Sequence, residues 1–168
     1  LFALIFGLIG FVDDYRKVRQ HQNEGLTARQ KFILQLAAAV VFLVLMRYEG
    51  LLTNDLYIPF LNMSFTINWI VYLIFAAFVI VGCVNAVNLT DGIDGLATGV
   101  TIPVMLFYVA VSAWYGRSDL ITAAAAMAGG LSAFLIYNFH PAKVFMGDTG
   151  SLFLGGAVCG LSLIHISE

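Results

Sequence analysis

The sequence predicts an all-α protein, a polytopic bundle of transmembrane helices with four full and two partial spans. Of the 168 residues, 61% are hydrophobic and only 11% are charged, whereas soluble domains are about half apolar and about a quarter charged. Stretches without charge recur at close to the roughly 20 residues that a helix needs to cross a bilayer. A water-soluble chain of this length could not bury so much apolar surface in one core. We therefore expect the bilayer to be its solvent.

The predicted spans follow one another along the chain. Pro103 is expected to kink one of them, and Gly129 and Gly130 are expected to allow close helix packing in another. Because apolar runs stand at both ends, we interpret residues 1–168 as a single transmembrane domain truncated at both ends. The predicted spans are 1–12 (the tail of a helix), 32–52 (with Arg47 near its end), 69–87, 96–115, 120–137, and a truncated one from Ser151.

The connections between spans alternate between two sides of the membrane. Residues 13–31, 88–95 and 138–150 fall on one side and carry six basic residues, whereas Arg47 and Arg117 are the two on the other. Basic residues favour the cytoplasmic side, so we expect these three loops to be cytoplasmic. Five of the seven aspartates lie at these three junctions. The predicted topology thus gathers carboxylates at one membrane face.

The first junction is the pair Asp13–Asp14, which we expect to end the first helix. Two adjacent carboxylates at a helix C-terminus are unfavourable, because the helix dipole is negative there. Lys17 together with a divalent ion would offset them. A solvated helix end is the alternative interpretation of this pair alone.

The second junction is the stretch from Asn88 to Gly95, in which Asp91–Gly92 is followed by Asp94–Gly95. An Asp followed by Gly at a three-residue repeat indicates tight turns and close approach of the backbone to a ligand. The oxygen ligands of a calcium-binding EF-hand loop are not reproduced here. An ordinary polar loop between spans is the alternative.

The third junction precedes the last span and contains Lys143, Phe145, Gly147, Asp148 and Gly150. Two glycines bracket an aspartate just before a helix N-terminus, which favours phosphate. A nucleobase could stack on the Phe145 ring. Hard oxygen ligands beside a phosphate-binding backbone indicate Mg²⁺.

The remaining metal-binding residue types do not form a predicted site. His21 and His140 are interpreted as loop residues and His165 lies in the C-terminal stretch. Cys83 and Cys159 sit in apolar runs, where a small buried hydrophobe is the usual role, with a disulfide or metal pair as the alternative. With a net charge of −2 and none of the usual motifs, no nucleic-acid partner is expected.

Four motifs resemble the polyprenyl-phosphate N-acetylhexosamine-1-phosphate transferases, a superfamily of membrane enzymes. They are GFVDDYRK at 10–17, GLTARQK at 25–31, NAVNLTDGIDGLA at 85–97 and PAKVFMGDTGS at 141–151. DDYRK, LTARQK and PAKVFMGDTGS are most similar to the muramoyl-pentapeptide branch. Residues 161–168 do not resemble the family, whose chains are about twice as long and carry a His-rich motif that this sequence does not contain.

The resemblance implies a reaction at the cytoplasmic face of the bacterial inner membrane, with several spans in the bilayer. UDP-MurNAc-pentapeptide and undecaprenyl phosphate would give undecaprenyl-diphospho-MurNAc-pentapeptide and UMP, with Mg²⁺ as cofactor. Direct attack and a covalent aspartyl-phosphate both stay open, as does a homodimer.

The resemblance also implies roles for single residues. Asp13, Asp14, Asp148 and Lys17 are the implied catalytic residues, with Asp13 a candidate base on the lipid phosphate. Asp148, Asn88 and Asp14 are the candidate metal ligands. The implied substrate-binding residues, which include a uridine pocket, are Asn88, Asp91, Gly92, Asp94, Phe145 and Lys143.

Two other functions are weighed against this one. A sister enzyme that transfers GlcNAc-1-phosphate shares the paired aspartates and the Asp-Gly-x-Asp-Gly turn, so only flanking residues separate it. A cation channel or transporter would place ionisable residues near the bilayer midplane. Here the full spans carry no formal charge apart from Arg47 near one helix end, which disfavours a channel.

Overall fold

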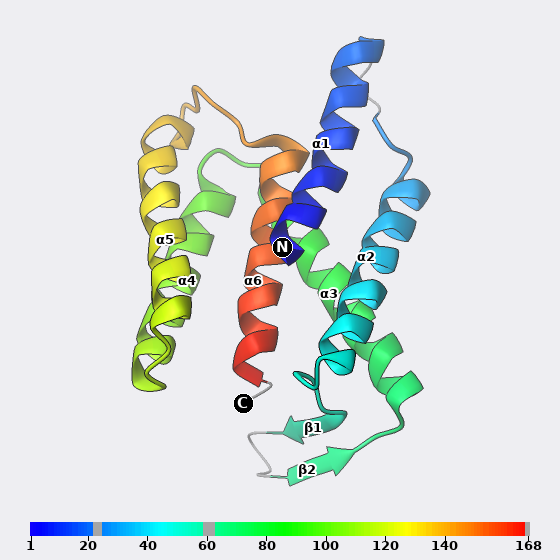
Figure 1. Ribbon diagram of the computed structural model, residues 1–168. Coiled ribbons are helices and arrows are strands. Elements are labelled where there is room, and N and C mark those ends of the chain that lie inside the picture. The colour runs from blue at the N-terminus through cyan, green and yellow to red at the C-terminus, as the bar shows by residue number, and fades with distance from the viewer. Residues whose placement is uncertain (22–24, 59–62, 167–168) are drawn as a thin grey trace.

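The computed structural model describes residues 1–21, 25–58 and 63–166, which form a helical bundle with one small hairpin (Figure 1). In chain order the elements are α1 (Phe2–Gln20), α2 (Ala28–Tyr48), β1 (Asp55–Ile58), β2 (Met63–Thr66), α3 (Trp69–Thr90), α4 (Leu96–Trp114), α5 (Ser118–Asn138) and α6 (Gly147–Ile166).

The predicted fold class is confirmed. Within the described residues, α2, α3, α4 and α5 are the four helices long and apolar enough to cross a membrane, judged by length and composition. They coincide with the four full spans predicted. α4 continues through Pro103 as one helix, and the predicted partial spans correspond to α1 and α6.

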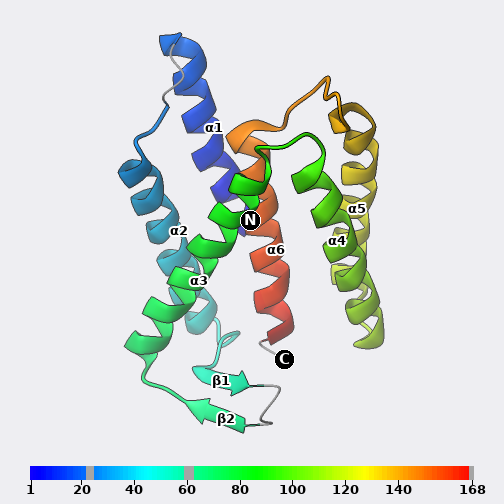
Figure 2. The same ribbon diagram turned by 180° about the vertical axis from the view of Figure 1, so that it is seen from behind.

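The helices form two groups joined by α6. Figures 1 and 2 both show α6 between the pair α4–α5 and the pair α2–α3, with α1 packed along α6. One apolar core lies among α1, α2, α3 and α6, where Phe6, Leu43 and Val84 are fully buried. A second core lies among α4, α5 and α6 around Met105. The central position of α6 brings its N-terminus close to α1 and α3.

Close helix packing occurs at glycines of α1 and α6. A Cβ on Gly10 would lie 2.7 Å from the Thr149 Cα atom, and one on Gly156 would lie 3.1 Å from the Ala3 Cα atom. By contrast, a Cβ on Gly129 or Gly130 would meet no described atom within 4 Å. The prediction of close packing at those two residues is therefore wrong for the described bundle, because they stand on its outside.

Several predicted boundaries are also wrong. α1 does not end at Val12 but continues through Asp13–Asp14 to Gln20, because Lys17 lies one turn further on and pairs with Asp13 at 2.6 Å. α2 begins at Ala28, where Thr27 and Gln30 form a capping box. The predicted loop 13–31 therefore shrinks to 21–27, of which residues 22–24 lie outside the described part.

The other two site-bearing loops are also shorter than predicted, because the helices beside them are longer. α3 runs to Thr90, so Asn88 lies on a helix rather than in the predicted loop 88–95. α6 begins at Gly147 instead of Ser151, so Asp148 occupies its first turn. The loop predicted at 138–150 is reduced to 139–146. A positive φ of 62° at Gly147 marks the sharp entry into α6.

The hairpin β1–β2 was not predicted. Its strands pair antiparallel, with Asp55 opposite Thr66 and Leu56 opposite Phe65. It connects α2 to α3 at the end of the bundle opposite the three aspartate-bearing junctions (Figure 1).

Polar side chains also lie inside the bundle. The amide of Asn85 on α3 donates to the Gln35 side-chain oxygen of α2, a bond between helices of the kind found in membrane proteins. Cys83 and Cys159 are free thiols, half-buried and buried, as expected of small core residues.

Candidate functional site

Three carboxylates from two helices meet at one end of the bundle. Asp13 and Asp14 lie in the second half of α1, and Asp148 lies in the first turn of α6. One oxygen from each of the three lies within 4.8 Å of the others. The sequence placed these residues at one membrane face, and the structure joins them into a single cluster.

Two lysines hold this cluster together. The Lys17 Nζ atom lies 2.6 Å from Asp13 Oδ2, 2.5 Å from Asp148 Oδ2 and 3.4 Å from Asp14 Oδ1. The Lys31 Nζ atom lies 3.0 Å from Asp148 Oδ2 and 3.4 Å from Asp13 Oδ2. With all five groups ionised, the carboxylates outnumber the ammonium groups, so the site keeps a negative excess.

The ion pairs shift the pKa values of groups that lie beyond the apolar segments. Burial lowers the pKa of Lys17, but hydrogen bonds to Asp13 and Asp148 outweigh it, so the pKa lies above its usual value. Burial raises the pKa of Asp148, but hydrogen bonds donated by Asn88, Lys17 and Lys31 more than reverse this effect, so the pKa lies below its usual range. Both groups are therefore charged at neutral pH.

Asp13 is the most buried member of the cluster, with 1% of its surface exposed. Its Oδ1 atom accepts a hydrogen bond from the Leu26 amide at 2.7 Å. Its Oδ2 atom is buried and accepts no well-aligned hydrogen bond from the described residues, although the lysine ammonium groups lie beside it. A Cβ on Gly25 would lie 2.7 Å from Asp13 Oδ1, so glycine is required for this approach.

Asp14 connects α1 to the start of α6. Its Oδ2 atom accepts hydrogen bonds from the Thr149 amide at 2.8 Å and from the Thr149 hydroxyl at 2.6 Å. A carboxylate at a helix N-terminus is favourable, because the helix dipole is positive there. Asp14 thus orients the turn that carries Asp148.

Asn88 supports Asp148 from α3. Its side-chain amide donates to Asp148 Oδ1 at 2.6 Å and to the Ser151 hydroxyl at 2.8 Å. In this geometry Asn88 gives Asp148 a donor rather than presenting an oxygen to a cation. The role of Asn88 as a metal ligand stays a prediction.

Asp91 follows α3 within electrostatic reach of the cluster. Burial, together with the negative charges of Asp148 and Asp14, raises its pKa to about 6. Asp91 therefore titrates closer to neutrality than an ordinary aspartate. Its position beside the cluster agrees with the substrate-binding role predicted for it, which stays a prediction.

Asp94 has a structural partner that the sequence did not indicate. Its Oδ2 atom lies 3.0 Å from the Ala142 amide nitrogen, which donates to it, and 3.0 Å from His140 Nδ1. These two bonds lower the pKa of Asp94 and tie the α3–α4 turn to the α5–α6 loop. The loop role expected for His140 agrees with this contact.

The other predicted substrate-binding residues lie at the same end of the bundle. Gly92, Lys143 and Phe145 are exposed, and the Phe145 side chain keeps 64% of its surface accessible. They belong to the α3–α4 turn and the α5–α6 loop. Their contact with a uridine stays a prediction.

A cavity of about 440 Å³ opens beside the cluster, between α1 and α2. Asp13, Lys17 and Lys31 contribute its charged groups. The remaining lining residues are Gly25, Leu26, Thr27 and Ala28. A polar ligand in this cavity would contact both lysines.

Sequence reasoning missed Lys31 and Thr149 as members of the site. Lys31 ends the motif GLTARQK at 25–31, but the resemblance assigns it no role in the site. The capping box at Thr27–Gln30 is a signal for the start of a helix. It could have placed Lys31 in the first turn of α2, shortly after the Leu26 amide that contacts Asp13. Thr149 carried no signal of its own, because its contact with Asp14 spans 135 positions of sequence.

The donor set suits a hard divalent cation. Three carboxylates converge, and one of their oxygens, Asp13 Oδ2, is buried without an aligned donor among the described residues. Mg²⁺ prefers one or two carboxylates together with substrate phosphates, and the adjacent lysines suit phosphate oxygens. Asp13, Asp14 and Asp148 are therefore able to hold Mg²⁺ next to a phosphate group.

Comparison with known proteins gives a consistent result. The model of the family described as "Glycosyl transferase family 4" matches residues 1–166. A phospho-N-acetylmuramoyl-pentapeptide-transferase of Staphylococcus carnosus is 48% identical over 165 residues, covering 97% of this chain and 51% of the relative. One from Oceanobacillus iheyensis is 46% identical over 161 residues, with coverage of 95% and 48%. One from Listeria monocytogenes is 41% identical over 164 residues, with coverage of 98% and 50%. The chain thus spans about half the length of these relatives.

Proposed function

The chain belongs to glycosyl transferase family 4, and from this membership we propose that its parent protein is a phospho-MurNAc-pentapeptide transferase. The donor is UDP-MurNAc-pentapeptide and the acceptor is undecaprenyl phosphate. An oxygen of the acceptor phosphate attacks the phosphorus that carries the sugar, and the bond from that phosphorus to the UMP oxygen breaks. The products are UMP and undecaprenyl-diphospho-MurNAc-pentapeptide.

One observation carries the proposal, namely the convergence of Asp13, Asp14 and Asp148 with Lys17 and Lys31. Phosphoryl transfer needs charge neutralisation and alignment more than it needs covalent chemistry from the protein. Two ammonium groups beside a polar cavity supply positive charge for the donor diphosphate and the acceptor phosphate. The named relatives are phospho-N-acetylmuramoyl-pentapeptide-transferases, which supports this choice of substrates.

The carboxylates take different parts in this proposal. Asp148 and Asp14 are the more accessible members and hold Mg²⁺, which when bound supplies Lewis-acid charge to the phosphate oxygens. Asp13 presents Oδ2 toward the acceptor phosphate and receives its proton, since Oδ1 is engaged by the Leu26 amide. Asp14 also keeps the first turn of α6 in place through Thr149.

The position of the site fits a reaction between a lipid and a soluble nucleotide. The cluster lies in the second half of α1 and at the beginning of α6, beyond the apolar segments of both helices. At that height a lipid phosphate and a water-soluble donor can meet. We propose that this end faces the bacterial cytoplasm, because six of the eight basic residues lie in the segments there.

The test of the proposal uses the full-length parent protein and two donors. A site built for the pentapeptide-bearing sugar can use remote binding energy at the reacting phosphate, so a truncated donor loses kcat as well as affinity. We expect UDP-MurNAc-pentapeptide to exceed UDP-GlcNAc in kcat/KM by at least about a hundredfold, roughly 2.7 kcal/mol.

The measurement is release of UMP with undecaprenyl phosphate and Mg²⁺ in detergent, one donor at a time. Equal use of the two donors, or a preference for UDP-GlcNAc, would assign the protein to the GlcNAc-1-phosphate branch. Release of UMP from neither donor would contradict the proposed reaction.

A further inference from the structure

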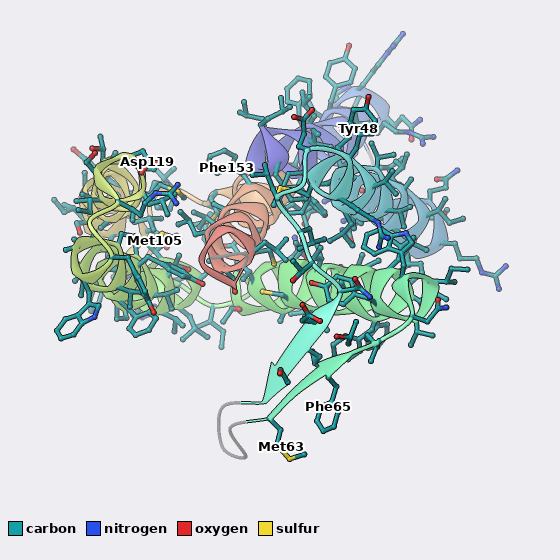
Figure 3. The ribbon with its side chains drawn as sticks, turned by 60° about the horizontal axis from the view of Figure 1, so that its bottom comes forward. Tyr48, Met63, Phe65, Met105, Asp119 and Phe153 are labelled. Atoms are coloured by element: carbon teal, nitrogen blue, oxygen red, sulfur yellow. The ribbon has the colours of Figure 1, made fainter. Side chains whose placement is uncertain are left out.

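The hairpin β1–β2 has one apolar and one polar face. Met63 and Phe65 are two positions apart on β2, so their side chains leave the same face of the hairpin, and 46% and 43% of their surfaces are exposed. Figure 3 shows both side chains on the part of the hairpin that extends away from the helices. Ser64 and Thr66 alternate with them, and the Thr66 hydroxyl donates to Asp55 on the neighbouring strand at 2.6 Å.

Aromatic residues mark the membrane boundary at this end of the bundle. Tyr48 is the last residue of α2, Trp69 is the first of α3 and Trp114 is the last of α4. Tryptophan and tyrosine are enriched where hydrocarbon meets water. The Arg47 guanidinium lies 4.1 Å from the centre of the Trp69 ring, as suits a cation at that boundary.

A short connection joins the hairpin to this boundary. β2 ends at Thr66 and α3 begins at Trp69, so two residues separate them. Phe65 precedes Trp69 by four residues, which span at most about 13 Å at roughly 3.3 Å per residue. Directly after the hairpin, α3 exposes Ile70, Val71 and Ile74, the apolar surface of a span that faces lipid.

We infer that the apolar face of β1–β2 rests on the bilayer, with Met63 and Phe65 inserted at the boundary between headgroups and acyl chains. The occupant of this face is lipid, because α3 exposes apolar side chains directly after the hairpin and the aromatic residues lie at the same end of the bundle. Asp55 is the only formal charge in the sequence of the two strands and lies outside this apolar pair. The inference depends on the membrane topology and not on the transfer reaction.

The test places a nitroxide spin label on β2 of the full-length parent protein in phosphatidylcholine–phosphatidylglycerol vesicles. Met63→Cys and Phe65→Cys probe the apolar face, while Ser64→Cys and Thr66→Cys are matched controls on the opposite face of the same strand. All other cysteines, Cys83 and Cys159 included, are replaced by alanine. The power saturation of each label is measured with oxygen, which partitions into lipid, and with a water-soluble nickel chelate.

We expect oxygen to relax the labels at positions 63 and 65 more strongly than the nickel chelate does, with the reverse order at 64 and 66. Stronger relaxation by the nickel chelate at all four positions would place the hairpin in water and overturn the inference. Weak relaxation by both reagents at 63 and 65 would show that protein covers the face, from the rest of the parent chain or from a second copy, and would also overturn it. If one of the two variants of a face does not fold, the label at the other position of that face is sufficient for the test.

Discussion

Two lysines and three carboxylates share the candidate site, and each depends on the others for its charge balance. The Lys31 ammonium lies 3.0 Å from Asp148 and 3.4 Å from Asp13, and its side chain is largely buried. Removing one partner from such a group leaves charge that water compensates poorly. The site is therefore expected to be sensitive to the loss of Lys31, a motif residue to which the resemblance assigned no role.

The first prediction concerns Lys31→Gln in the full-length parent protein. We expect kcat/KM for UMP release to fall about a hundredfold or more, the effect typical of removing one preorganised donor from a phosphate or oxyanion site. Arg29→Gln, an exposed residue in the same helical turn, is the matched control and should retain activity. Equal losses in the two variants would contradict a specific role for Lys31, because they would mean that only the net positive charge of the segment matters.

The second prediction concerns the raised pKa of Asp91, about 6. Between the usual aspartate pKa and 6, the folded protein binds more protons than the unfolded chain, so the free energy of unfolding falls as pH rises through this window. Asp91→Asn removes the free-energy cost of ionising this carboxyl group in the folded protein. We expect the variant, in EDTA, to gain thermal stability over the wild type at pH 8 and to lose this advantage near pH 4.

The measurement is the thermal unfolding midpoint of both proteins in detergent across that pH range. A variant that is less stable than the wild type at pH 8 would contradict the electrostatic account of Asp91.

Residue types and spacing were enough to identify the carboxylates, but not their partners. Asp13, Asp14 and Asp148 follow from acidic residues at helix boundaries on one membrane side. Lys31 and Thr149 do not, because their contacts depend on how closely α1, α2 and α6 approach. That approach is a property of packing and has no local sequence signal.

At the scale of the helices, the close approach of α1 and α6 positions the site, and this approach depends on Gly10. α1 and α6 make the most extensive helix contact of the described bundle, and Gly10 lies directly against the backbone of Asp148 and Thr149. Small residues allow such close approach between membrane helices. The distance between Asp13 and Asp148 thus depends on the absence of a side chain at Gly10.

The third prediction tests that dependence with Gly10→Ala. The added methyl group would overlap the Asp148 backbone, so we expect α6 to shift, the thermal unfolding midpoint to fall by several degrees and UMP release to decrease. Gly82→Ala on α3 is the control, because no described atom lies within 4 Å of its added Cβ and alanine favours a helix by up to about 1 kcal/mol. Equal stability of the two variants would contradict the packing account.

The spans were predictable from the sequence, whereas their ends were not. Apolar length identified α2 to α5, since lipid requires long uncharged helices. Charged residues were interpreted as helix ends, but Asp13 and Lys17 pair within one helix and let α1 continue. The hairpin was missed because strands of four residues leave only a weak pattern in a short connection between two spans.

At the scale of the whole molecule, the described helices place all three site-bearing junctions at one end and the hairpin at the other (Figure 1). The distribution of basic residues predicts which end faces the cytoplasm. Donor nucleotides are made in the cytoplasm, so the proposed reaction requires this orientation.

The fourth prediction is therefore about sidedness. Single cysteines replace Gly92 and Lys143 at the site end and Ser118 at the start of α5, in an otherwise cysteine-free parent protein. In intact cells an impermeant maleimide should label the Ser118→Cys protein alone, and permeabilisation should expose the other two. Labelling at position 92 or 143 in intact cells would reverse the orientation and separate the site from its nucleotide donor.

The central claim is that the cluster around Asp148 is the reaction site, and Asp148→Asn tests it most directly. The full-length variant is assayed for release of UMP from UDP-MurNAc-pentapeptide in Mg²⁺, beside Asp119→Asn, the same change at an exposed residue that pairs with Arg117. Loss of a carboxylate proposed to bind Mg²⁺ should cost several kcal/mol of transition-state stabilisation, about three orders of magnitude in rate. We expect that loss for Asp148→Asn alone, with folding retained, whereas near-normal turnover by the folded variant would remove Asp148 from the site.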